Sequence, residues 1–202
     1  MKKVLAIAAA LLLIGTSAFA QSFGAGYVQS TQSNGSDSAA SNGFYAGFGY
    51  TAEIAPGIAL NPGIYYEFLT ASSASNLGNF LTYNGKTTEH YVNVPLHISL
   101  AYSFAPTFKL FVYGGPTASL GIASNTKESG SIAGFGGTST TDNYASGDYS
   151  RFDILAGGGV GAEVMKKFRV NVGYDFGLLD RNKSDNGTLK RNRLTAGVAY
   201  VF

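Results

Sequence analysis

Two histidines on one segment are the first residues in this sequence that could support catalysis. His90 and His97 lie in "EHYVNVPLHISLAYSF", and the chain is rich in hydroxyl side chains that a histidine could activate. Asp153 could complete a triad with His97 in some strand registers. However, positions 90 and 97 differ in parity, so in a strand the two imidazoles point to opposite faces and do not converge on one substrate or metal ion. We therefore predict no catalytic residue, no metal site and no enzyme.

Glycine-rich strings raise a second possibility, a phosphate-binding loop. The string "GGGVG" lies within "LAGGGVGAEV", an alternating segment that contains no Lys-Ser or Lys-Thr pair. The sequence also has no cysteine, which excludes thiol chemistry, zinc-thiolate sites and disulfide bonds. We predict that the chain uses no cofactor.

Nine charged residues fall on the polar faces of alternating segments. In an arrangement that turns those faces inward, they form two layers, each containing both signs. Unpaired charges in a narrow interior are costly, so we expect the layers to neutralise themselves as buried ion pairs. A polar path or a catalytic cluster is the alternative. The nine residues of this predicted lumen charge network are Glu67, Lys109, Arg151, Asp153, Glu163, Arg169, Asp175, Arg191 and Arg193.

Alternating segments must position these side chains. In "RVNVGYDFGLL" every second residue is apolar, which is the period of a β-strand with one apolar face. The same pattern predicts eight strands, at about residues 22–32, 43–53, 58–70, 87–104, 109–124, 150–165, 169–179 and 189–202. The links after the second, fourth and sixth strands are short ("IAPG", "APTF", "KKF"). Those after the first, third, fifth and seventh are long and rich in Ser, Thr, Asn and Gly.

This alternation of short and long links predicts the fold class: all-β, an eight-stranded antiparallel up-and-down transmembrane β-barrel. Lipid requires the apolar faces outside and the polar faces in the lumen. Inward glycines face large inward aromatic residues, Tyr45, Tyr65, Phe111 and Tyr113, so we expect side chains to fill a lumen of this size. An even strand count places both termini on the periplasmic side and the four long loops outside the cell. A soluble lipocalin-like barrel is the structural alternative.

The N-terminal segment predicts export. Residues 1–20 combine two lysines, an apolar stretch and the triplet Ala18, Phe19, Ala20, as in a signal peptide cleaved before Gln21. Residues 21–202 would then form the barrel. Without Lys2 and Lys3, the 14 Lys and Arg residues become 12 against 12 Asp and Glu, so the mature chain is formally neutral. A neutral chain without a basic cluster gives no reason to expect nucleic-acid binding.

The C-terminal segment "LTAGVAYVF" alternates up to the last residue. We predict that this strand pairs with the first to close the barrel, and that the barrel assembly machinery recognises its outward face. An alternative is a strand that simply runs to the chain end. The predicted assembly signal comprises Leu194, Ala196, Val198, Tyr200 and Phe202.

Three segments, "YVNVPLHISLAYSF", "KLFVYGGPTASLG" and "DFGLLDRN...LKRNRLTAGVAYVF", resemble the outer-membrane β-barrel domain family common in Bacteroidota, which includes PorT-like proteins. The matching motif positions are Tyr91 and Pro95, Gly115 and Pro116, and Gly177 and Leu178, and Asn93 stands where the family often has an acidic residue. The resemblance implies an outer-membrane barrel of a Gram-negative bacterium. PorT-like members imply a role in protein secretion, and small barrels of the OmpX and Ail type imply adhesion.

The predicted function is structural or surface-interacting, with loops that bind external partners. An accessory role in a secretion or transport assembly is the first alternative, with a secretion-machinery protein as partner. A barrel enzyme acting on lipid or peptide is the second.

Overall fold

The computed structural model describes residues 20–34, 37–77, 81–132, 135–145, 147, 149–183 and 187–202. The predicted signal peptide lies outside these residues except for Ala20, where the first strand begins. The described strands are β1 (Ala20–Ser33), β2 (Ser38–Ala55), β3 (Ile58–Leu77), β4 (Leu81–Ala105), β5 (Phe108–Ile132), β6 (Phe135–Asp142), β7 (Phe152–Val164), β8 (Phe168–Gly177) and β9 (Lys190–Val201). The described ranges contain no helix long and apolar enough to cross a membrane.

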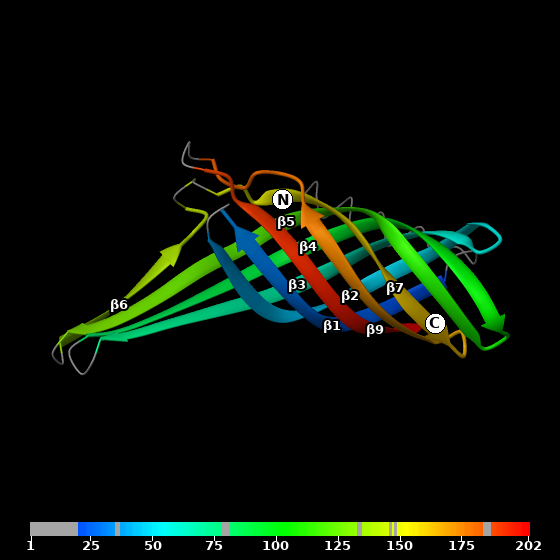
Figure 1. Cartoon of the computed structure of the whole chain (residues 1–202), viewed down its shortest axis with the longest axis horizontal. Coiled ribbons are helices and arrows are strands. Elements are labelled where there is room, and N and C mark those ends of the chain that lie inside the picture. Colours follow the sequence, from blue (N-terminus) through cyan, green and yellow to red (C-terminus); the bar gives the residue numbers. More distant parts are fainter. Residues whose placement is uncertain are drawn as a thin grey trace.

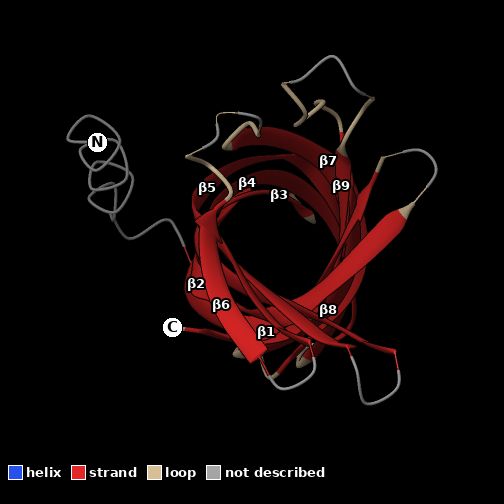
Figure 2. Cartoon of the chain, turned by 90° about the vertical axis from the view of Figure 1, so that its left-hand side faces the viewer, coloured by secondary structure: helices blue, strands red, loops and turns tan. Residues whose placement is uncertain are grey.

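Eight of these strands form a closed antiparallel ring, as the sequence predicted. Hydrogen bonds link β4, β3, β2, β1, β9, β8, β7 and β5 in that order, and β4 also pairs with β5. Figure 2 shows the barrel viewed along its axis. The first and last strands pair from Ser22 with Val201 to Ser33 with Lys190, so the chain closes on itself and leaves no open edge in the wall. The ninth strand, β6, pairs with β5 outside the ring.

Three tight turns define one end of the barrel, which we call the turn end (Figure 1). They join β2 to β3, β4 to β5, and β7 to β8. Gly57 takes a φ of 75° in the first, and Met165 and Lys166 take φ values of 55° and 59° in the third. Such positive φ values are typical of the turns that match the twist of two antiparallel strands. The opposite end is the loop end.

The two faces of the wall differ in the way that lipid requires. Large apolar side chains point outward along β4 and β8, and Tyr102 and Phe104 are 68% and 63% exposed. Charged and polar side chains point inward, together with a small apolar cluster of Val28, Leu69 and Tyr91. The apolar side chains are thus outside and the charged ones inside, which is the reverse of a soluble barrel, and the soluble lipocalin-like alternative is wrong.

Long hairpins replace three of the four predicted long loops. At the loop end β3, β4 and β5 continue past the ring and β6 adds to them (Figure 1). We call this extension the protruding sheet: residues 71–77, 81–88, 125–132 and 135–142. Threonine favours strands, but both faces of this sheet are exposed and polar, so no alternation marks it in the sequence.

Candidate functional site: the barrel lumen

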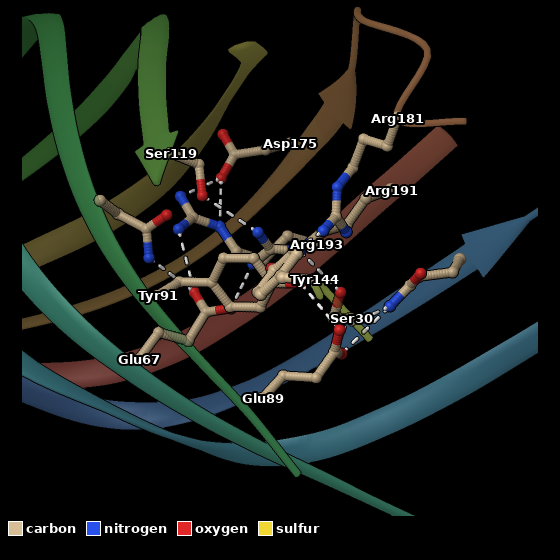
Figure 3. Close-up of polar contacts among 12 residues, drawn as sticks. Ser30, Glu67, Glu89, Tyr91, Ser119, Tyr144, Asp175, Arg181, Arg191 and Arg193 are labelled. Atoms are coloured by element: carbon tan, nitrogen blue, oxygen red, sulfur yellow. Dashed lines mark hydrogen bonds and ion pairs between the residues drawn. The ribbon is translucent and has the colours of Figure 1, made fainter. Parts of the chain in front are cut away.

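Four charged side chains form a cluster in the loop-end half of the lumen. Glu67 projects from β3 and binds Arg191 through one carboxylate oxygen and Arg193 through the other, the latter at 3.2 Å. Arg193 also binds Asp175 at 2.6 Å through Nη2 and at 3.0 Å through Nε. Two acids and two guanidinium groups, drawn from β3, β8 and β9, thus neutralise one another (Figure 3).

Hydrogen bonds complete the burial of this loop-end cluster. The side chains of Arg191 and Glu67 are 0% exposed. Arg191 donates to the hydroxyls of Ser30 and Ser119, each at 3.0 Å, and its guanidinium lies 3.8 Å from the centre of the Tyr91 ring. A buried ion pair is tolerated only when its remaining donors find acceptors, and those of Arg191 do.

A second set of residues covers the cluster, and sequence reasoning missed it. Arg181 comes from the β8–β9 loop, is 2% exposed, and lies 5.4 Å from the centre of the Tyr91 ring. Its Nη2 donates to the Tyr144 hydroxyl at 3.3 Å. Glu89 accepts hydrogen bonds from Gln32 at 3.0 Å and from the Tyr91 hydroxyl at 2.9 Å. Glu89 lies in the predicted strand 87–104 and has the same parity as His97, so the alternation places it inside, whereas nothing in "DRNKSDNGT" marks Arg181.

Two other residues of the predicted lumen charge network, Asp153 and Arg151, are in none of the salt bridges among the described residues. Asp153 is 1% exposed inside the lumen, and neither of its carboxylate oxygens takes a hydrogen bond from a described residue. Arg151 is exposed, which corrects the prediction that it lies in the lumen. Strand β7 begins only at Phe152, so Arg151 is beyond the wall, where its guanidinium lies 4.4 Å from the Tyr144 ring centre and donates to the Ile122 carbonyl at 2.8 Å.

The remaining three charged residues meet in the turn-end half. Glu163 of β7 binds Arg169 of β8 at 2.7 Å and Lys109 of β5 at 3.3 Å. Arg169 also donates to the Thr51 hydroxyl at 2.8 Å. The Lys109 side chain is 38% exposed, so this turn-end cluster lies near solvent.

Between the two clusters the lumen is open, which corrects the prediction that side chains fill it. A cavity of about 290 Å³ extends from Gly57 and Lys109 at the turn end to Asn93 and Arg193. The four aromatic residues predicted to point inward all line it, but they do not cross it. Their rings lie over glycines of the wall, in the space that a Cβ atom at those positions would need.

The histidines do not converge. His97 faces the lumen, where its ring stacks on Tyr113 with 5.3 Å between ring centroids and its Nε2 lies 3.2 Å from the Thr117 hydroxyl. The described contacts of His97 do not include Asp153. His90 lies on the outer face, against Tyr66 and Phe68. Among the described residues, the hydrogen-bond partners of the two histidines are the hydroxyls of Tyr66 and Thr117, and neither histidine is hydrogen-bonded to an acid.

The predicted assembly residues lie on the outer face of β9. Val198 is 60% exposed and Phe202 is 73% exposed. The Tyr200 ring contacts the rings of Phe168 and Phe202 at 5.5 and 5.3 Å, and the Phe202 amide donates to the Gln21 carbonyl at 2.9 Å. The last residue is thus part of the closing seam.

A closed ring with an apolar outside and a charged inside defines a transmembrane β-barrel of the Gram-negative outer membrane. The chain belongs to the family described as Outer membrane protein beta-barrel domain, whose model matches residues 15–181. The outer-membrane barrel family and fold expected from the sequence are thus confirmed, whereas the likeness to PorT-like proteins of Bacteroidota stays a prediction. No curated protein matches the chain.

Solved structures share the architecture. The chain is similar to Ail, the attachment invasion locus protein of Yersinia pestis, in a crystal structure with the heparin analogue sucrose octasulfate. The identity is 15%, the coverage is 91% of this chain and 99% of Ail, and the TM-score is 0.51. It is also similar to Neisserial surface protein A, with 14% identity, coverage of 93% and 99%, and a TM-score of 0.51. At these identities the likeness concerns the fold.

Proposed function

We propose that this protein is a non-enzymatic surface-interaction barrel, that both termini face the periplasm, and that the protruding sheet binds anionic polysaccharides outside the cell. The proposal rests on one observation about that sheet. Lys86 of β4 and Lys127 of β5 are directly opposite each other, so both side chains point to the same face.

Placing two like charges side by side is unfavourable unless something else compensates. Lys86 and Lys127 are both exposed. The salt bridges among the described residues all lie in the lumen, and none of them includes either lysine. An external anion would relieve the repulsion between them.

The rest of that face suits a sulfated or carboxylated sugar chain. The strand register continues the row of the two lysines to Ser72 on one side and to Thr140 on the other, and both can form hydrogen bonds. Asp142, the acidic residue of this face, already accepts a hydrogen bond from the Tyr144 amide at 2.9 Å. The crystal structure of Ail with a heparin analogue supports the same ligand chemistry for this fold.

The proposal is tested with the barrel in lipid nanodiscs and heparin as the probe. We expect K86Q combined with K127Q to weaken heparin binding about tenfold, roughly 1.4 kcal/mol, and to reduce its salt dependence. K183Q is the matched control, because Lys183 is an exposed lysine of the β8–β9 loop at the same end. Dextran, a neutral polysaccharide, should not bind.

Two results would contradict the proposal. One is heparin binding that the double variant and K183Q lower equally, which would indicate general charge attraction. The other is no salt-dependent heparin binding by the unaltered barrel at all.

A further inference from the structure

The cavity in the turn-end half of the lumen has a wall of aromatic faces. A Cβ added at Gly161 would lie 2.3 Å from the Phe111 ring, and one added at Gly173 would lie 2.3 Å from the Tyr113 hydroxyl. Tyr45 meets Gly197 in the same way, at 2.1 Å. Because each ring occupies the space that a neighbouring side chain would take, the rings lie flat against the wall. The lumen therefore stays open although its residues are large.

A buried acceptor with no partner lies beside the inner end of the cavity. Asn93 is 1% exposed and lines the cavity. Its Nδ2 donates to Glu67 at 2.9 Å, whereas its Oδ1 accepts no hydrogen bond from a described residue. Leaving a buried carbonyl oxygen unpaired costs about 1 to 3 kcal/mol, and an O–H or N–H group in the cavity would recover it.

The charges around the cavity balance. At the mouth Lys109 and Arg169 face Glu163 and Glu53. At the inner end Arg193 is held by Asp175 and Glu67 within the neutral loop-end cluster, and His97 lies on the wall between. The lining contains three acidic and three basic side chains, so it favours a neutral molecule.

Size and lining together define the chemistry of the ligand. Pockets for drug-sized molecules start at about 300 Å³, so a cavity of about 290 Å³ suits a single ring. Aromatic faces carry partial negative charge and attract the C–H groups of a ring that stacks on them. The amides of Asn61 and Asn171 and the hydroxyl of Ser99 add hydrogen-bonding groups.

We infer that this turn-end cavity is a binding site for a small neutral ring compound bearing hydroxyl groups, of the size and chemistry of a monosaccharide. The ligand enters at the turn end, stacks on the aromatic wall and donates a hydrogen bond to the Asn93 carbonyl oxygen. The loop-end cluster closes the other end, so the site is a blind pocket. The inference is independent of polysaccharide binding by the protruding sheet.

The test uses the whole barrel in lipid nanodiscs, because many detergents carry sugar headgroups. Binding of glucose is followed by saturation-transfer NMR. Ala199 of β9 and Ala59 of β3 both line the cavity. We expect A199F, and separately A59L, to fill the cavity and to weaken glucose binding at least about tenfold.

A162F is the matched control, because it puts the same side chain on the outward face of β7, where Ala162 pairs with Leu110 and Val170. It should leave binding unchanged. A second NMR experiment uses a fully O-methylated glucoside, which keeps the ring but has no O–H donor, and we expect it not to bind.

Several outcomes would overturn the inference. Glucose binding that survives in both A199F and A59L would place the site elsewhere. Equal loss in A162F would indicate a general effect on the barrel. Binding of the methylated glucoside, of phenol alone or of glucuronate alone would assign the cavity to another class of ligand.

Discussion

Both halves of the lumen contain ion pairs between glutamate and arginine, but the loop-end half is closed and the turn-end half contains a cavity. In the loop-end half, Arg191 and Glu67 are completely buried. In the turn-end half, Glu163 also pairs with an arginine, but Arg169 and Lys109 are 18% and 38% exposed and a cavity lies beside them. The charges themselves therefore do not decide whether a barrel interior is solid.

The difference comes from what surrounds the ion pairs. At the loop end, Tyr91 lies across the lumen between two guanidinium groups, and Arg181 and Tyr144 cover it. At the turn end, the tyrosines lie along the wall over glycines. At the loop end the Tyr91 ring thus closes the lumen by stacking on charges, whereas at the turn end the rings lie against the wall and leave a cavity.

The largest effect should come from breaking the loop-end cluster. E67A leaves Arg191 and Arg193 buried without their shared acid, so we expect a loss of about 3 to 5 kcal/mol in the free energy of unfolding. Urea unfolding of the folded barrel, followed by circular dichroism, measures it.

The matched variant is E163A in the turn-end cluster. Its partners reach solvent, so we expect a loss of about 1 kcal/mol or less. Equal losses in E67A and E163A would contradict the distinction between the two halves.

The role of aromatic orientation gives the next effect. Y91L removes the ring between Arg181 and Arg191 and the hydrogen bond to Glu89, and we expect it to cost about 2 to 3 kcal/mol of unfolding free energy. Y113L, beside the cavity, loses a stack on His97 and should cost about 1 kcal/mol. A larger loss in Y113L than in Y91L would show that the wall aromatics, not the cross-lumen one, hold the barrel together.

The seam at the turn end is predicted to matter more for assembly than for stability. Phe202 is mostly exposed and contacts Tyr200, so its deletion removes little buried surface. If the outward face of β9 is an assembly signal, deletion should slow insertion by the assembly machinery about fivefold, roughly 1 kcal/mol in activation free energy, while urea unfolding changes less. V170A, on the outer face of β8, is the control. Equal effects of the deletion on insertion and unfolding would favour a strand without a signal.

Most of the barrel wall was readable from the sequence because lipid and lumen impose opposite demands on alternate residues. Val170, Val172 and Tyr174 alternate with polar residues and glycine, and the strand predicted from them at 169–179 corresponds to β8. The protruding sheet was not found, because water on both faces of residues such as Thr138 and Ser139 imposes no alternation.

The lumen was predictable only in part. Parity places all nine charged residues inside, whereas the structure has eight of them there, because Arg151 lies just before the first residue of β7. Parity also could not show that Arg181 folds in from a loop, because loops have no fixed period. The cavity depends on which glycine faces which ring across separate strands, and that register is a property of the closed barrel.

The smallest effect concerns the loop above the solid half. The amides of Leu189 and Asn182 donate to the Asp180 carboxylate at 2.8 and 2.9 Å, and these bonds lower the pKa of Asp180 below its ordinary value. A lowered pKa means that the folded loop favours the ionised acid, so this contribution is present above the ordinary pKa and is lost as the pH falls through the lowered one. Hydrogen exchange at the Leu189 amide should therefore lose protection, relative to its intrinsic rate, on going from about pH 5 to pH 3.

The turn-end amide of Lys167, which donates to the Val164 carbonyl, should keep its protection, and D180N should remove the pH dependence at Leu189. Because Arg181 is the next residue, a pH response of Leu189 that D180N leaves intact would instead point to the charges buried beneath the loop as its source.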